Sequence, residues 1–186
     1  MDRPHLVRRA VHMSAPLFLL YYWVPDEVLG LNKGIWLVIL AASFFVFEIW
    51  RLRSRTAVLG MRDYEKHRMS AAAWFVLAAL PALLFFPLGY TLPVFLGMGL
   101  VDPLIGELRS RSSRLYPLLP TLAYLVLALG SMLLIFGPQA HVVVAALVAT
   151  ALAIWVEGLR IEWLDDDFTM IVVPLLGITL TFALLA

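Results

Sequence analysis

Long apolar stretches alternate with short charged clusters along the whole chain. A membrane-spanning helix needs about 20 mostly apolar residues, and seven stretches approach that length. They cover residues 10–30, 34–50, 70–88, 91–109, 116–136, 140–157 and 169–186. The pattern predicts an all-α fold: a polytopic membrane helical bundle of about seven transmembrane helices that forms a single domain over residues 1–186.

Composition supports a membrane protein. Hydrophobic residues make up 62% of the chain, charged residues 15%, and the mean hydropathy is +0.91. Soluble domains are about half apolar and about a quarter charged. The sequence contains no cysteine, which excludes disulfides, thiol nucleophiles and thiolate metal sites.

The basic residues are distributed asymmetrically between the predicted spans. Thirteen of the fourteen Lys and Arg residues fall at the N-terminus or within residues 51–68, 107–114 and 157–167, and only Lys33 lies on the other side. The positive-inside rule makes the charged side cytoplasmic, so the N-terminus is expected inside and the C-terminus outside. Most acids lie at the same face, which indicates chemistry on a polyanionic reactant from the cytoplasm. The short loops favour a prokaryotic plasma membrane.

The N-terminal sequence RRAVH contains two arginines and a histidine at helical spacing. Arg8, Arg9 and His12 would share one helical face at the cytoplasmic mouth of the bundle. They could form a phosphate clamp with a hydrogen-bonding imidazole. They could equally be a topogenic basic cluster followed by an interfacial histidine.

Glu48 is an acid near the end of the second predicted span. A carboxylate inside a membrane helix is costly, so it is expected to face the bundle interior and to pair with a base. Arg51, one turn away, is the local candidate. The pair could serve a site, or it could be a structural ion pair.

The segment GMGLVDPLIG, residues 97–106, interrupts the fourth predicted span. Asp followed by Pro is typical of a helix start, and the preceding glycines favour a loosened backbone. We therefore expect a broken helix whose second half begins at Asp102 and offers free N–H groups to phosphate. A capped helix with a proline kink is the alternative. The partner of Asp102 must come from another helix or from a metal ion.

The run from Glu157 to Pro174, EGLRIEWLDDDFTMIVVP, carries three adjacent carboxylates beside a membrane helix. Three such groups repel one another unless a cation or an arginine relieves them. Oxygen ligands without His or Cys suit Mg²⁺, which takes one or two carboxylates together with substrate phosphates. Helix capping explains one of the three acids and leaves the other two unexplained.

The order of these motifs resembles the CTP-dependent lipid-alcohol kinases, a family that includes dolichol or polyprenol kinase, phytol and farnesol kinase and the yeast-type diacylglycerol kinase. The match covers most of the chain in order. It rests on Arg8, Arg9 and His12, on Glu48 and Arg51, on the segment from Asp102 to Gly106, and on Glu157, Asp165, Asp166 and Pro174. The chain has Val101 where the family has Gly, Asp167 where it has Asn, and no Lys-Ser/Thr-x-x-Gly stretch after the middle motif.

The resemblance implies Mg²⁺-dependent transfer of a γ-phosphoryl group from CTP, or from ATP, to the hydroxyl of a polyprenol, a phytol-like isoprenoid or diacylglycerol. Glu48, His12 and Asp102 are the expected catalytic residues. Asp102, Asp165 and Asp166 are the expected metal ligands. Arg8, Arg9, Arg51, Arg109 and Glu157 are expected to bind the nucleotide.

Two other classes of function fit parts of the sequence. One is a cytidylyltransferase or a CDP-alcohol phosphotransferase, although the paired-Asp signature of the latter is absent. The other is a small membrane transporter or a scaffold without enzymatic activity. The expected partners are the bilayer, a nucleotide and a lipid alcohol; nucleic acid is not expected, and the oligomeric state is left open.

Overall fold

The computed structural model of the chain describes residues 3–58, 60–111, 113–159 and 164–186, and it is all-α, with 79% of residues in helices. The described strands, β1 (Glu27–Val28) and β2 (Leu31–Asn32), form one short antiparallel hairpin. The helical elements are α1 (Arg3–Met13), η1 (Ala15–Trp23, 3₁₀), α2 (Lys33–Ser54), η2 (Asp63–Lys66, 3₁₀), α3 (Ala71–Phe85), α4 (Leu88–Leu96), η3 (Gly97–Val101, π), α5 (Asp102–Ser110), α6 (Leu118–Phe136), α7 (Ala140–Gly158) and α8 (Asp166–Leu185).

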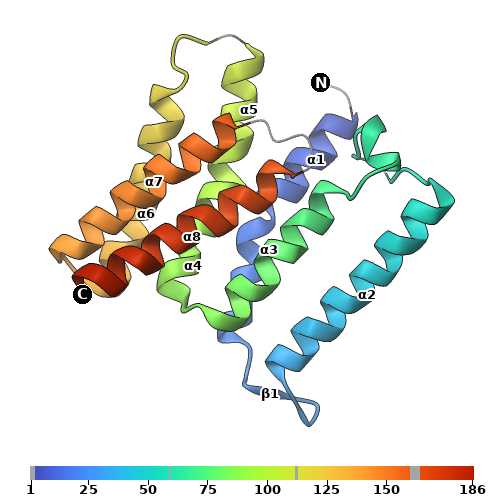
Figure 1. Cartoon of the computed structure of the whole chain (residues 1–186), viewed down its shortest axis with the longest axis horizontal. Helices are drawn as coiled ribbons and strands as arrows, with labels where there is room; N and C mark the ends of the chain where they lie inside the picture. Colours follow the sequence, from blue (N-terminus) through green and yellow to red (C-terminus); the bar gives the residue numbers. More distant parts are fainter. Residues whose placement is uncertain (1–2, 59, 112, 160–163) are drawn as a thin grey trace.

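The helices run between two ends of a bundle (Figure 1). The N-terminus, the end of α2, the end of α5 and the start of α8 lie at one end, and the β hairpin and the C-terminus lie at the other. Helix α8 packs against α7, α3 and α4, while α2 packs against α3 at the edge of the bundle. The charged segments of the sequence therefore meet at one end of the fold.

Five helical segments are long and apolar enough to cross a membrane, judged by length and composition. They are Lys33–Ser54, Leu88–Ser110, Leu118–Phe136, Ala140–Gly158 and Asp166–Leu185. These correspond to five of the seven predicted spans. An integral membrane protein is thus supported, whereas seven spanning helices are not.

The other two predicted spans differ because prolines end or divide their helices. The stretch 70–88 forms the 15-residue helix α3, which stops where Phe86 becomes extended before Pro87. The stretch 10–30 is divided: α1 ends at Met13, and a 3₁₀ helix with Pro16 in its first turn continues to Trp23. Neither part alone has the length of a spanning α-helix.

Small residues allow the central helices to pack closely. Ala145, Ala146, Ala149 and Ala153 of α7 are all completely buried, and a Cβ at Gly177 of α8 would lie 2.4 Å from Leu152 Cδ1. Small side chains at helix contacts are typical of membrane bundles, where van der Waals packing drives association. The close packing of α7 and α8 positions the two helix ends that carry Glu157 and the Asp165–Asp167 run.

Candidate functional site

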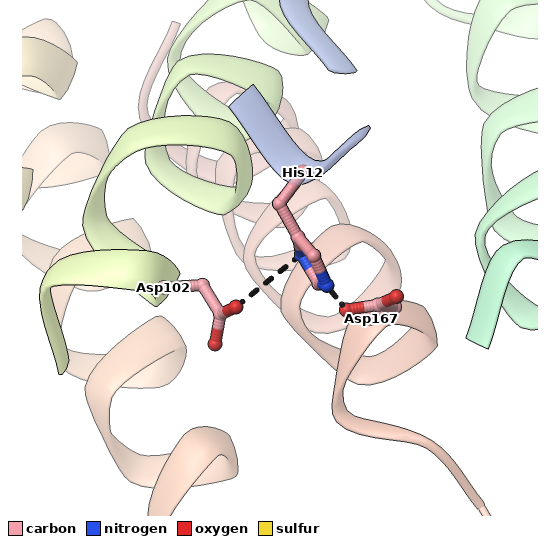
Figure 2. A group of neighbouring side chains, drawn as sticks. All are labelled: His12, Asp102 and Asp167. Carbon is pink, nitrogen blue, oxygen red and sulfur yellow. Dashed lines mark ion pairs between the residues drawn. The ribbon is translucent and has the colours of Figure 1, made fainter. Parts of the chain in front are cut away.

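Three distant parts of the chain bring His12, Asp102 and Asp167 together (Figure 2). His12 comes from α1, Asp102 from the first turn of α5 and Asp167 from the first turn of α8. The Nδ1 atom of His12 lies 3.4 Å from Asp102 Oδ2 and 3.6 Å from Asp167 Oδ1. His12 and Asp167 are buried, and among the described residues Nδ1 of His12 has no hydrogen-bond partner. This buried nitrogen thus faces two carboxylates within ion-pair range without a hydrogen bond to either.

Gly99 allows α1 to approach Asp102. A Cβ at position 99 would lie 2.7 Å from Pro16 Cδ and 3.1 Å from the His12 carbonyl oxygen. A residue with a side chain could not fit there without moving the backbone of α1, so glycine is required for packing. The sequence interpretation that Gly97 and Gly99 loosen the backbone did not include this packing role of Gly99.

The predicted break before Asp102 is also absent from the described fourth span. Residues Leu88–Ser110 form one uninterrupted helical segment in which Gly97–Val101 is a π-helical turn. Asp102 has right-handed helical angles, and its N–H donates to the Gly97 carbonyl oxygen. Because the helix continues through this turn, α5 does not offer a free N-terminus to phosphate. The carboxylate of Asp102 is the group that this segment contributes.

The acids of the site form overlapping groups that could hold a cation. Ligand atoms of Asp102, Glu157 and Asp166 lie within 4.8 Å of one another, and so do those of His12, Asp102 and Asp167. Asp165, Asp166 and Asp167 form a third such group. The structure thus brings together the predicted metal ligands Asp102 and Asp166 and links them to Asp165 at the start of α8.

Asp165 shows the electrostatic cost of this crowding. Its Oδ1 caps α8 by accepting a hydrogen bond of 3.2 Å from the Asp167 N–H. Burial, the hydrogen bond with Asp166 and the negative charge of Asp166 raise the pKa of Asp165 to about 7. Carboxylate oxygens of this kind fit Mg²⁺, which binds through one or two carboxylates and substrate phosphates. We therefore regard the donor set as suited to a magnesium ion.

The positive charge of two arginines acts on the acids. The charges of Arg62 and Arg8 both act on the Asp166 carboxylate, and that of Arg62 also acts on Asp165. Arg8 comes from α1, whereas Arg62 comes immediately before η2. Positive charge that acts on acids able to hold a cation is an arrangement that suits phosphate groups.

The other predicted phosphate ligands are engaged in ion pairs. Arg9 pairs with Glu107. Arg109 donates to Glu157 Oε2 at 2.6 Å and to the Tyr116 hydroxyl at 2.7 Å. Because Glu157 also belongs to the acidic cluster, the pair of Arg109 and Glu157 lies at the border of the site. Arg8 and Arg62 are the other described arginines whose positive charge acts on the acids.

Arg51 lies apart from the acidic cluster. It is completely buried and donates to Glu48, to the Glu65 carbonyl oxygen at 2.7 Å and to the Arg68 carbonyl oxygen at 2.9 Å. Glu48 also accepts a hydrogen bond of 2.7 Å from the Ser70 N–H. Both residues thus anchor the segment between α2 and α3, and this arrangement favours the structural interpretation of the pair.

Sequence reasoning missed the individual roles of Arg62, Glu65 and Asp167. Glu65 is buried and accepts hydrogen bonds from the backbone N–H groups of Arg62 and Ala71. Glu65 supplies the glutamate half of a capping box by accepting from the Arg62 N–H, but Arg62 lacks the Ser or Thr hydroxyl that makes this pattern recognisable in a sequence. Asp167 belongs to the acidic run and is the buried second residue of α8. A prediction that this helix buries its second residue would have identified it.

An apolar cavity of about 340 Å³ lies beside the cluster, between α1–η1, α2 and α3. Arg8, His12, Glu48 and Asp167 are among its polar lining residues. Most of the remaining wall is apolar and includes Phe44, Phe75, Val76 and Met98. The cavity therefore joins the buried histidine to an apolar compartment. Residues 160–163, which belong to the predicted charged run, lie outside the described residues.

Comparisons with protein-family models, curated proteins and solved structures found no match for this chain.

Proposed function

We propose that the protein is a membrane-bound, Mg²⁺-dependent kinase that transfers a γ-phosphoryl group from a nucleoside triphosphate to the hydroxyl of a membrane lipid alcohol. The observation that carries the proposal is the junction of two compartments at His12. One contains clustered carboxylates and arginines, and the other is an apolar cavity. A reaction between a charged, soluble donor and an apolar acceptor needs both.

The carboxylates of Asp102, Asp165 and Asp166, with Glu157 beside them, would hold the magnesium ion. The chemistry that Mg²⁺ supplies when bound is neutralisation of the phosphate charge. Arg8 and Arg62 approach the same acids from α1 and from the segment before η2, where they would bind the donor phosphates. Their fixed position stabilises the charge that spreads over the transferred group.

His12 is the favoured group to receive the proton of the acceptor. In the proposed step the lipid hydroxyl oxygen bonds to the γ-phosphorus while the bond from that phosphorus to its bridging oxygen breaks. The nucleoside diphosphate leaves, and the hydroxyl proton passes to the His12 imidazole. Glu48 is less suited to this role because both its oxygens accept hydrogen bonds from Arg51.

The membrane orientation follows from the charged end of the bundle. We infer that this end faces the cytoplasm, with the N-terminus inside and the C-terminus outside, because it carries the basic clusters. The donor would then bind from the cytoplasm of a prokaryotic plasma membrane. CTP is the favoured donor and ATP the second, on the resemblance described above.

The test is transfer from γ-labelled CTP, with ATP and GTP in parallel, to polyprenols, phytol, geranylgeraniol and diacylglycerol in detergent. Each pair is measured with Mg²⁺ and with a chelator. A labelled lipid formed only with Mg²⁺ is the expected result. Absence of product with every pair, from protein that is monodisperse and shows a cooperative thermal transition, would exclude the proposal.

A further inference from the structure

The apolar cavity has a polar end and an open side. His12, Asp167 and Arg8 line the part that adjoins the acidic cluster, and aromatic and aliphatic side chains line most of the rest. A ligand that matches these walls has one small polar group and one long apolar body. A nucleotide is polar over most of its surface and would not match the apolar part of this cavity.

The open side is formed by apolar residues from two separate groups of helices. Val11 and Phe18 belong to α1 and η1, whereas Phe47 belongs to α2 and Val58 follows that helix. All four line the cavity and are exposed, by 56%, 43%, 42% and 43% respectively. Exposed apolar side chains on both sides of an opening are what a route to the lipid phase requires.

The packing of the surrounding helices explains why the opening lies here. Helix α2 packs against α3, whereas α1 and η1 pack against η3 and α4. The cavity lies between α2 on one side and α1 and η1 on the other, α3 contacts both sides, and Gly60 and Met61 of the segment after α2 also line it. Arg51 anchors that segment through the carbonyl oxygens of Glu65 and Arg68. The exposed lining residues Val11, Phe18 and Phe47 therefore mark the side between η1 and α2 as open.

We infer that this cavity is the binding site for the lipid-alcohol acceptor, which slides in sideways between η1 and α2 with its hydroxyl directed at His12 and its chain against α3. The inference rests on the proposed function for the identity of the ligand as an alcohol. It goes further in assigning the acceptor site, its lateral opening and the direction of the bound chain. The nucleotide would occupy the opposite side of His12, beside Asp102 and Asp166.

Ala72 and Val76 of α3 are the positions that test the inference. Both line the cavity and neither belongs to the acidic cluster. Ala72→Trp places a large side chain in the cavity, and Val76→Phe is a smaller change in the same wall. The matched control is Ala42→Trp, because Ala42 is exposed on α2 and lies outside the cavity lining.

The experiment is photocrosslinking in lipid nanodiscs with an analogue of geranylgeraniol that carries a diazirine on its chain and a free hydroxyl. Peptide mapping is expected to place the crosslinks on η1, α2 and α3. Ala72→Trp should reduce crosslinking at least 10-fold and Val76→Phe should reduce it measurably, while Ala42→Trp retains it. Unlabelled geranylgeraniol should compete, whereas phosphatidylcholine should not.

Each outcome decides one point. Crosslinks that map elsewhere, or a folded Ala72→Trp variant with unchanged labelling, would overturn the acceptor site even if phosphoryl transfer occurs. Crosslinks in the cavity without transfer from any nucleotide would leave a lipid-alcohol site and remove the kinase proposal. If both cavity variants fail to fold, the crosslink map of the natural sequence decides the question.

Discussion

Arg51 binds Glu48 through two hydrogen bonds of 2.7 Å, from Nε to Oε2 and from Nη2 to Oε1, and the two side chains are 0% and 2% exposed. This bidentate pair connects α2 to the segment before α3, because Arg51 also donates to the carbonyl oxygens of Glu65 and Arg68. The same segment carries Arg62, whose charge acts on Asp165 and Asp166. The Arg51–Glu48 pair therefore helps to position Arg62, whose charge acts on the acidic cluster.

Loss of one partner of this pair is expected to destabilise the fold strongly. Glu48→Gln leaves the Arg51 guanidinium buried without its counter-ion, and such losses cost about 3–5 kcal/mol. We expect a lower free energy of unfolding and a lower thermal midpoint in detergent. Lys33→Met is the control, because it removes the Lys33–Asp26 pair, in which Asp26 is exposed, and exposed pairs contribute about 0–1 kcal/mol. Equal effects of the two substitutions would contradict the prediction.

Gly99→Ala should displace α1 from the acidic cluster. The new Cβ would overlap with Pro16 and crowd the His12 carbonyl oxygen, and overpacking of this kind costs about 1–3 kcal/mol. We expect lower stability together with weaker Mg²⁺ binding, measured by thermal unfolding with and without the ion. Gly106→Ala is the matched control in the same helical segment, because nothing lies within 4 Å of its Cβ. A Gly99→Ala protein that behaves like Gly106→Ala would refute this explanation of the glycine.

Neutralising the clustered acids should remove metal binding without unfolding the protein. Asp102→Asn and Asp166→Asn each delete a charge from the group formed with Glu157. We expect Mg²⁺ affinity to fall at least about 10-fold, the lower limit seen when even an outer partner of a metal site is lost. Direct titration with Mn²⁺ followed by paramagnetic resonance measures it. Glu27→Gln in the hairpin, an exposed acid at the other end of the bundle, should bind as the natural sequence does.

Arg62→Gln should weaken the interaction with the nucleotide while the acidic cluster remains. A hydrogen bond to a charged group contributes about 1.5–3 kcal/mol, so kcat/KM for the donor should fall about 10-fold or more. Arg53→Gln is the control, because Arg53 belongs to the same basic segment and is exposed. The measurement is nucleotide-dependent transfer at several donor concentrations. Unchanged kcat/KM in Arg62→Gln would remove this arginine from the donor site.

Helix positions were largely predictable because the apolar stretches are long and the charged clusters between them are distinct. The failures occurred where prolines changed the backbone, as at Pro16 and Pro87, which hydropathy alone does not register. The continuous path through Gly97–Val101 was also missed. A glycine pair before Asp-Pro fits both a broken helix and a π-helical turn, and only the contacts with Pro16 and Tyr124 separate them.

Most residues of the candidate site could be predicted from the sequence because a charged side chain is costly in a membrane. Asp102, Glu157 and Asp166 could be named individually, and the structure brings them together. Their neighbours could not be deduced in the same way. The path of the segment that carries Arg62 depends on two hydrogen bonds between side chain and backbone: Arg51 donates to the Glu65 carbonyl oxygen, and the Arg62 N–H donates to the Glu65 carboxylate.

The π-helical turn at Gly97–Val101 sets the rotational phase between the two halves of its span. A turn of this kind holds one more residue than an α-helical turn. The half that begins at Asp102 is therefore rotated about the helix axis, relative to Leu88–Leu96, compared with its position in a regular α-helix. Each residue of an α-helix advances by about 100°. Deleting one residue here would keep the apolar character of the segment and still turn the Asp102 carboxylate away from His12. The residue count of this span is therefore itself part of the site.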